Sequence, residues 1–130
     1  MNEKEELRKI KKINDLMYIF FYMKNTKRSF RSYFDRRNYK SVAVYGMGNL
    51  GKALVEELIS EGVKVEYAID KRAENIFYAI DIYEPDANSL KKVDILVITA
   101  IICLGEIEEK LYEKLNCDIV YIEDIIKECL

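Results

Sequence analysis

Three glycines are the residues of this chain whose spacing points most directly to chemistry. Gly46, Gly48 and Gly51 form the pattern G-x-G-x-x-G, after the apolar stretch Val42–Tyr45 and before an amphipathic stretch. The first glycine of such a turn permits a tight bend from strand to helix, the second leaves the backbone open to a pyrophosphate, and the third lets helix and strand pack closely. Backbone N–H groups of the first helical turn then face the phosphates. The sequence therefore predicts a dinucleotide-binding turn made of Gly46, Met47, Gly48, Asn49, Leu50 and Gly51.

Asp70 extends this prediction from phosphate to sugar. It follows the alternating stretch 63–69, which we expect to be the second strand. A carboxylate at the end of that strand accepts hydrogen bonds from both hydroxyls of an adenosine ribose and repels a 2′-phosphate. Lys71 and Arg72 follow at once and can offset this repulsion. The pattern favours NAD over NADP as the cofactor and includes Lys71 in the site. The alternative is a glycine turn that has lost its ligand or binds a different nucleotide.

Further candidate residues lie where the fourth strand ends. Thr99 and Ala100 close the apolar stretch 93–99 at the predicted switch point of the sheet, so we place them beside the far half of the cofactor. Their alternative role is structural, as the last turn of a buried strand. Cys103 lies just beyond them, and without an adjacent base it fits a buried structural thiol better than a nucleophile.

Acid–base and metal chemistry find little support in this sequence. The chain contains no histidine, which removes the commonest general base and every zinc site that uses histidine. No cysteine spacing indicates a metal. Tyr67 and Lys71 have the Tyr-x-x-x-Lys spacing of short-chain dehydrogenases, but they lie on and just past a strand, away from the helix on which that pair works. We therefore predict no catalytic and no metal-binding residues.

The elements that must position these residues alternate between strands and helices. After two N-terminal helices, we expect strands at 42–45, 63–69, 79–83, 93–99 and 118–122. The helices are expected from the glycine turn to Ser60, at 106–115 and at 123–130, with a single turn at 88–92. On the first of these, we place Leu50, Ala53, Leu54, Leu58 and Ile59 on the inner face. The connection before residue 79 is too short for a full helix, so one sheet face is expected to be thinly covered. This order predicts an α/β fold with a three-layer parallel sheet of about five strands in the order 3-2-1-4-5.

The chain divides into two segments of opposite charge. Residues 1–40 hold 12 Lys or Arg against five Asp or Glu, whereas residues 41–130 hold nine against 18. We expect 1–40 to be a helical extension for packing or dimerisation and 41–130 to be the nucleotide-binding domain. The basic extension favours self-association or packing on the acidic domain. A protein partner is the next alternative, and nucleic acid is the least favoured.

Cysteine usage and hydropathy bear on the compartment. Three cysteines, with no C-x-x-C pair, suit free thiols in a reducing compartment, so we expect a cytoplasmic protein. The apolar run 16–23 is far shorter than the roughly 20 residues that span a membrane, and its flanks do not resemble a secretory signal. We therefore expect no membrane association.

At these residues the chain resembles the NAD(P)-binding Rossmann superfamily. The segments SVAVYGMGNLGKAL, VKVEYAIDK and VDILVIT look like its first strand with the glycine turn, its acidic second-strand end and its fourth strand. The run from Val42 through IDIYEPDANSL also resembles small nucleotide-binding domains of bacterial sugar-nucleotide and surface-polysaccharide enzymes, such as the head domain of sugar acyltransferases. This resemblance implies NAD or a sugar nucleotide as ligand.

Three hypotheses for the function follow. The first is a stand-alone NAD-type module without a complete active site, which acts as a sensor, a subunit or a severed domain, with sugar-nucleotide or surface-polysaccharide metabolism as its expected setting. The alternative is a small NAD(P)-dependent oxidoreductase or sugar-nucleotide-modifying enzyme with its active site at a homodimer interface. A regulatory protein whose basic arm binds nucleic acid is a third, less favoured hypothesis.

Overall fold

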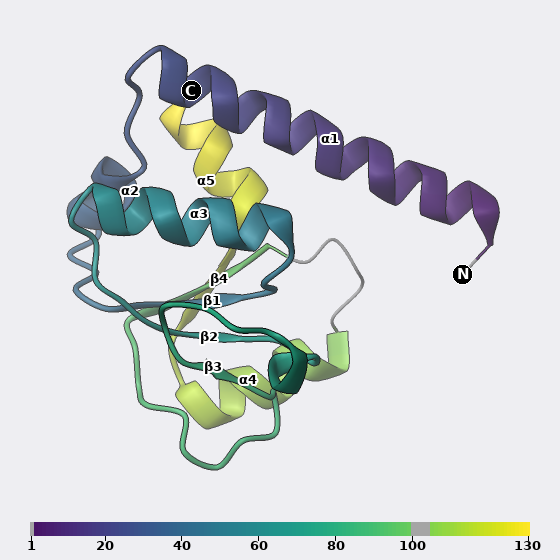
Figure 1. Cartoon of the computed structure of the whole chain (residues 1–130). Coiled ribbons are helices and arrows are strands. Elements are labelled where there is room, and N and C mark those ends of the chain that lie inside the picture. Colours follow the sequence, from purple (N-terminus) through teal and green to yellow (C-terminus); the bar gives the residue numbers. More distant parts are fainter. Residues whose placement is uncertain (1, 100–104) are drawn as a thin grey trace.

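The fold is a five-stranded parallel sheet with helices on both faces, as predicted. The computed structural model describes residues 2–99 and 105–130, and their side chains except those of 105–108. The strands pair in the order β3-β2-β1-β4-β5, all parallel (Figure 1). They are β1 (Val42–Tyr45), β2 (Val65–Ile69), β3 (Ile82–Tyr83), β4 (Ile95–Ile98) and β5 (Asp118–Tyr121). Every residue of β1 and β4 is buried, because central strands of a parallel sheet are covered on both faces.

The helices divide unequally between the two faces. They are α1 (Glu3–Asn25), α2 (Arg31–Arg36), α3 (Asn49–Ser60), α4 (Gly105–Leu115) and α5 (Ile122–Cys129). What we call the α3 face is covered by α1, α2, α3 and α5, which share one apolar core with Val44 and Val97 of the sheet. The α4 face carries α4 and the segment 84–94, packed against Tyr45 and Ile98. Figure 1 shows this arrangement, with α4 alone among the helices on its side of the sheet.

α3 ends as its sequence predicts. Gly62 has a φ of 82°, and its N–H donates to Ile59 O at 3.0 Å. The N–H of Val63 reaches Leu58 O at 2.9 Å, which completes a Schellman motif. Val63 is therefore part of the helix end, and β2 begins two residues later than predicted. The expected burial of Ile59 is wrong, since this side chain is 49% exposed; it lies about 110° around the helix from the centre of the buried stripe.

The connections around β3 differ in part from the prediction. Between β2 and β3 the chain forms only the 3₁₀ turn Ala73–Asn75, which confirms that no full helix fits there. The predicted single-turn helix at 88–92 is wrong, and β3 is shorter than the predicted 79–83. The segment after β3 instead turns at 85–86 and again at 88–89. Beyond these turns it is attached to the sheet, since Val93 is buried on the α4 face and the Tyr67 hydroxyl donates to Lys91 O. The α4 face is thus covered by loops where a further helix could have packed.

The N-terminal helices join the core of the sheet. The rings of Phe20 and Phe30 stack with centroids 5.4 Å apart. Glu61, at the end of α3, accepts from the N–H of Arg31 at 3.1 Å, and its backbone O accepts from the Arg31 guanidinium at 2.9 Å. On the other side of α2, Glu128 of α5 accepts from Arg37 at 2.6 Å, and this hydrogen bond lowers the pKa of the Glu128 carboxyl. Part of the basic extension is therefore neutralised within the chain.

No helix in the described part of the chain is both long enough and apolar enough to cross a bilayer.

Candidate functional site

The glycine turn is held from both sides by the strands next to β1. Gly46 has a φ of 99°, a conformation that glycine adopts without steric cost. Its N–H donates to Ile69 O of β2 at 2.8 Å, and its O accepts from the Thr99 hydroxyl at 2.6 Å. Thr99 also continues the ladder, since its N–H donates to Tyr45 O at 2.9 Å. The turn is therefore fixed at the carboxyl edge of the sheet, where open α/β sheets bind their ligands.

Gly51 is required by close packing. A Cβ at this position would lie 1.8 Å from Gly46 O and 3.1 Å from the Thr99 hydroxyl oxygen. No side chain fits into that space without displacing the backbone of the turn. The first turn of α3 can lie this close to the end of β1 only because residue 51 has no side chain.

Gly48 is not required by the fold. It is the N-cap of α3, with φ −73° and ψ −166°, an extended conformation that any residue adopts. A Cβ there would meet no heavy atom of residues 2–99 and 105–130 within 4 Å, and position 48 is exposed. Because the cap residue has no side chain, it offers no acceptor to the first N–H groups of α3. In the described part of the chain, the second glycine of the motif therefore borders open space beside backbone donors that no cap side chain binds.

Asp70 turns its carboxylate toward the glycine turn. Oδ2 accepts from the Met47 N–H at 2.7 Å, and Oδ1 accepts from the Arg72 N–H at 2.8 Å. The Arg72 Nε lies 3.7 Å from Oδ1 as an ion pair. Asp70 is 7% exposed and belongs to the few buried polar residues. The carboxylate thus joins the end of β2 to the turn after β1, two segments that the sequence separates widely.

The other predicted site residues take different positions. The side chains of Met47 and Leu50 are buried in the core of the α3 face, so only their backbone faces the site. Asn49 is exposed, and Thr99 is buried with its hydroxyl used on Gly46. Ala100 and Cys103 lie outside the described residues. The structure therefore brings the glycine turn, Asp70 and Thr99 together at one edge.

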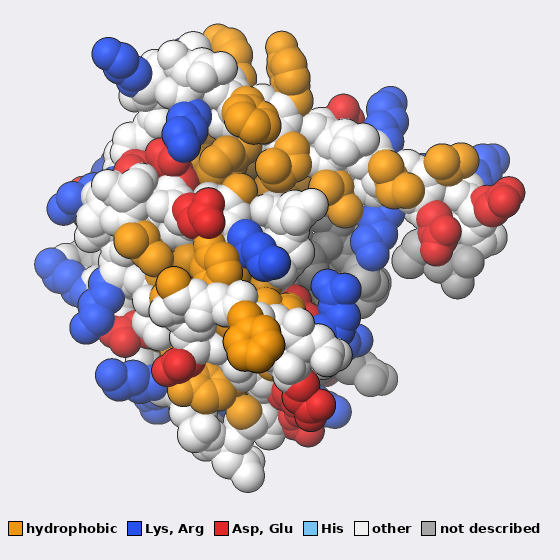
Figure 2. Space-filling model, viewed as in Figure 1, with side chains coloured by type: hydrophobic (Ala, Val, Ile, Leu, Met, Phe, Trp, Pro, Cys, Tyr) orange, Lys and Arg blue, Asp and Glu red, His pale blue; other side chains and the backbone are white. Residues whose placement is uncertain are grey.

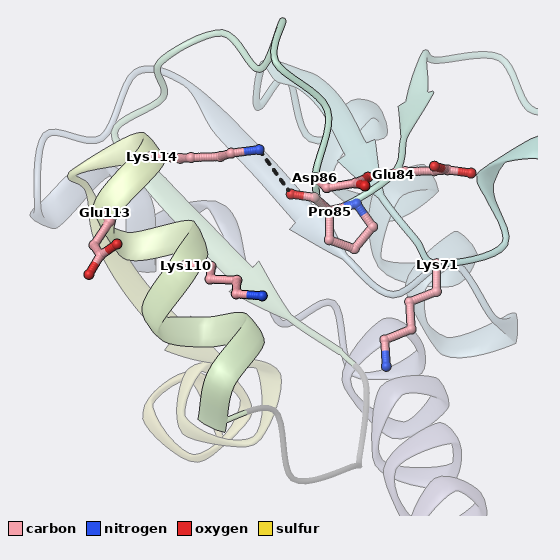
Figure 3. A pocket seen from close by; sticks show the side chains of 7 residues that line it. All are labelled: Lys71, Glu84, Pro85, Asp86, Lys110, Glu113 and Lys114. Atoms are coloured by element: carbon pink, nitrogen blue, oxygen red, sulfur yellow. Dashed lines mark hydrogen bonds between the residues drawn. The ribbon is translucent and has the colours of Figure 1, made fainter.

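A cavity of about 620 Å³ lies between the carboxyl ends of β2 and β3 and the helix α4. Figure 3 shows Lys71 and Lys110 extending toward the same space from opposite sides, and its dashed line is the hydrogen bond that Lys114 donates to Pro85 O at 3.5 Å. Lys114 also donates to Ala87 O at 2.9 Å. The lining residues are Lys71, Glu84, Pro85, Asp86, Lys110, Glu113 and Lys114. Of these, the sequence had indicated only Lys71 as a site residue. The others come from separate segments and form no motif.

A second cavity, of about 720 Å³, lies at the other edge of the sheet. Its walls include Tyr39, Ile95 and Asp118, where β4 and β5 begin. The hydroxyl of Tyr39 donates to the carboxylate of Asp118, and burial and this hydrogen bond raise the pKa of Tyr39 to about 12. Because ligands of open sheets bind at the carboxyl edge, this cavity is separate from the candidate site.

Tyr45 adds a polar group that the sequence did not indicate. Its side chain is 3% exposed on the α4 face, and its hydroxyl has no hydrogen-bond partner among the described residues. Burial, together with the charge of Asp70, raises the pKa of Tyr45. A buried hydroxyl without a hydrogen-bond partner is uncommon and lowers the stability of the folded state.

Groups that could hold a metal ion are absent from the described residues, where no three His, Cys, Asp or Glu side chains lie suitably together. The described arrangement instead offers backbone donors, one carboxylate and a cavity with charged walls. Such a set binds and orients a polar ligand. No protein-family model matches the chain, and no curated protein is significantly similar to it, so its assignment depends on this geometry.

Proposed function

We propose that the protein binds a dinucleotide of the NAD type at the turn 46–51 and acts as a binding module, as a sensor, a subunit or one domain of a larger enzyme system. The observation that carries this proposal is Gly48. The fold accounts for Gly46 by its positive φ and for Gly51 by its contact with Gly46. The described residues do not account for Gly48, since its backbone is in an ordinary extended conformation and a Cβ there would meet none of their atoms within 4 Å. Close approach of a pyrophosphate to the backbone accounts for the absence of a side chain there.

Asp70 supports recognition of a ribose. A carboxylate offers about four acceptor positions, two on each oxygen. The N–H groups of Met47 and Arg72 use one on each oxygen, and the Arg72 guanidinium lies 3.7 Å from Oδ1 as an ion pair. No other hydrogen bond from a described residue reaches the carboxylate, so one acceptor position remains on each oxygen. The 2′ and 3′ hydroxyls of a ribose supply two donors with matching spacing. A 2′-phosphate would instead meet the negative charge, so NAD is the better fit than NADP.

The cavity beside Lys71 offers space for the rest of the nucleotide. Since the ribose would lie at Asp70, the attached base would extend past the next residue, Lys71, whose side chain lines the cavity. Both lysines and carboxylates line its walls, so hydrogen bonds to a base or a second sugar are available. A sugar nucleotide uses the same phosphate and ribose contacts, and it is therefore the closest competing ligand.

Two variants at position 48 test the proposal. Asp and Asn are both preferred N-caps and nearly equal in size, so Gly48→Asp and Gly48→Asn should each fold with an unfolding temperature at or above that of the wild type. The aspartate places a negative charge next to the diphosphate and should weaken binding of NADH about 100-fold or more. The asparagine adds only bulk and should weaken it less. Calorimetric titration measures both, with NADPH and a UDP-sugar as competitors.

The outcome that would contradict the proposal is equally direct. If the wild type binds none of NADH, NADPH and UDP-sugars at millimolar concentration, the turn has no nucleotide function. If Gly48→Asp and Gly48→Asn bind as tightly as the wild type, the ligand lies elsewhere. Binding of the UDP-sugar alone would replace the dinucleotide by a sugar nucleotide.

A further inference from the structure

Helix α1 carries an apolar stripe that the described chain leaves uncovered. Leu16, Phe20 and Met23 face the body of the protein and are buried in the core of the α3 face. In contrast, Leu7 is 66% and Phe21 is 59% exposed. Figure 1 shows that the N-terminal half of α1 extends beyond the sheet, and Figure 2 shows hydrophobic side chains along it. In this half of the helix, Lys12 forms an ion pair with Glu123 of α5 at 2.9 Å, but the apolar side chains of Leu7 and Ile10 stay more than half exposed.

The spacing of the stripe is that of a coiled coil. Leu7, Ile10, Asn14, Met17 and Phe21 follow one another at alternating intervals of three and four residues, which are the a and d positions of a heptad. Ile10 is 54% exposed and Asn14 is exposed, whereas Met17 is half-buried. We call these five residues the α1 seam. An asparagine at one central a position is typical of two-stranded coiled coils, in which it fixes the register at a cost in stability.

Apart from Met17, which packs against the core of the α3 face, the seam points away from the body of the protein. At roughly 100° per residue, its centre lies about 130° around the helix axis from the stripe of Leu16, Phe20 and Met23. If a second helix lies along the seam in parallel, a twofold axis between the helices puts the two bodies on opposite sides. The sheet domains therefore do not obstruct such a pair.

We infer that two copies of this chain associate through α1 as a parallel, in-register, two-stranded coiled coil. In this register, Glu6 is a g position and Lys11 the following e position, so Glu6 of each copy meets Lys11 of the other. The two Asn14 side chains face each other and can hydrogen-bond. In an antiparallel pair, g positions face g positions and e positions face e positions, which removes this charge match.

The charges around the seam favour a second copy over a lipid surface. The projecting segment 3–15 holds five Lys or Arg and four Asp or Glu, in mixed order. Helices that bind anionic membranes carry a strongly basic polar face. Mixed charge beside a heptad seam is what pairing of like helices requires.

Sedimentation of the full chain over a concentration series tests the inference. The wild type should move from monomer to dimer as concentration rises. The double variant Leu7→Lys/Ile10→Lys should stay monomeric at every concentration, with an unchanged unfolding temperature when measured at a concentration where the wild type is monomeric. The matched control is Phe77→Lys, which also replaces an exposed apolar residue by lysine. Phe77 is 97% exposed and lies outside the α1 seam, so this variant should dimerise like the wild type.

A charge exchange tests the parallel register. Glu6→Lys and Lys11→Glu should each weaken the dimer about fivefold, since each replaces two attractive pairs by repulsive ones. The combined variant restores both pairs and should dimerise nearly as well as the wild type. Neither residue is buried, so the fold should not change.

Three results would overturn the inference. A wild type that is monomeric at all concentrations would exclude the dimer, and cosedimentation of that monomer with anionic vesicles would assign the seam to a lipid surface. A Leu7→Lys/Ile10→Lys variant that still dimerises would place the interface elsewhere. A charge exchange that fails to restore association would exclude the parallel register.

Discussion

The two faces of the sheet are covered in different ways, although the same strands supply both. On the α3 face, four helices close over the strands, and the residues of α3 that face inward are buried. On the α4 face, one helix and the loops of 84–94 share the cover, and a charged cavity lies between them. Consecutive residues of one strand belong to different faces, as with Val44 and Tyr45. The candidate site at the carboxyl edge is therefore closely packed on the side of the α3 face, whereas a cavity adjoins it on the side of the α4 face.

This difference follows from the crossovers. The β1–β2 connection contains α3, but the β2–β3 connection contains only the 3₁₀ turn Ala73–Asn75, and β3–β4 contains no helix. A long amphipathic helix buries a continuous stripe, whereas a loop covers a sheet by single side chains such as Val93. We expect the α3 face to tolerate almost no added or removed volume and the α4 face to tolerate more. Three experiments test this difference between the faces.

The largest effect is expected from Gly51→Ala on the α3 face. The added Cβ would overlap the backbone oxygen of Gly46 at 1.8 Å, so α3 must shift away from β1. We expect the free energy of unfolding to fall by about 4 kcal/mol, measured by urea denaturation. Gly48→Ala is the matched control, because its Cβ meets no atom of the described residues within 4 Å. It should cost no more than about 1 kcal/mol, through the weaker N-cap. Equal costs for the two variants would contradict the distinction between them.

The glycine turn shows why some of this site could be predicted. Three glycines at fixed spacing impose a local geometry that depends on few other residues, so the turn follows from the sequence. The alternation of strands and helices predicts the parallel order, and the alternating stretch 63–69 places Asp70 at the end of β2. The partners of Asp70 do not follow, because Met47 meets it only after β1 and β2 pair. The lining of the cavity could not be predicted either, since Lys71, Asp86 and Lys110 meet only through tertiary packing.

A second, intermediate effect compares leucines on the two faces. Leu54 of α3 and Leu111 of α4 are 0% and 1% exposed. Leu54→Ala should lower the free energy of unfolding by about 3 kcal/mol. The helices packed around residue 54 leave little freedom to fill the cavity that the shorter side chain creates. Leu111→Ala should cost about 2 kcal/mol, since the loops near α4 can relax into the space. Chemical denaturation of both variants measures the difference. A larger cost at Leu111 would show that the α4 face is the more tightly packed of the two.

The smallest effect, with the opposite sign, is expected at Tyr45. Its hydroxyl is buried on the α4 face with no hydrogen-bond partner among the described residues. Tyr45→Phe removes this hydroxyl and keeps the ring between Ile69 and Ile98, the residues that pair with position 45 on the neighbouring strands. We expect the free energy of unfolding to rise by about 1 kcal/mol, because an unpaired buried polar group costs free energy. Leu54 lies on the opposite face, so the change in Tyr45→Phe/Leu54→Ala should equal the sum of the single changes. A destabilised Tyr45→Phe would mean that the hydroxyl is hydrogen-bonded in the native protein and that the α4 face is more fully closed than the comparison states.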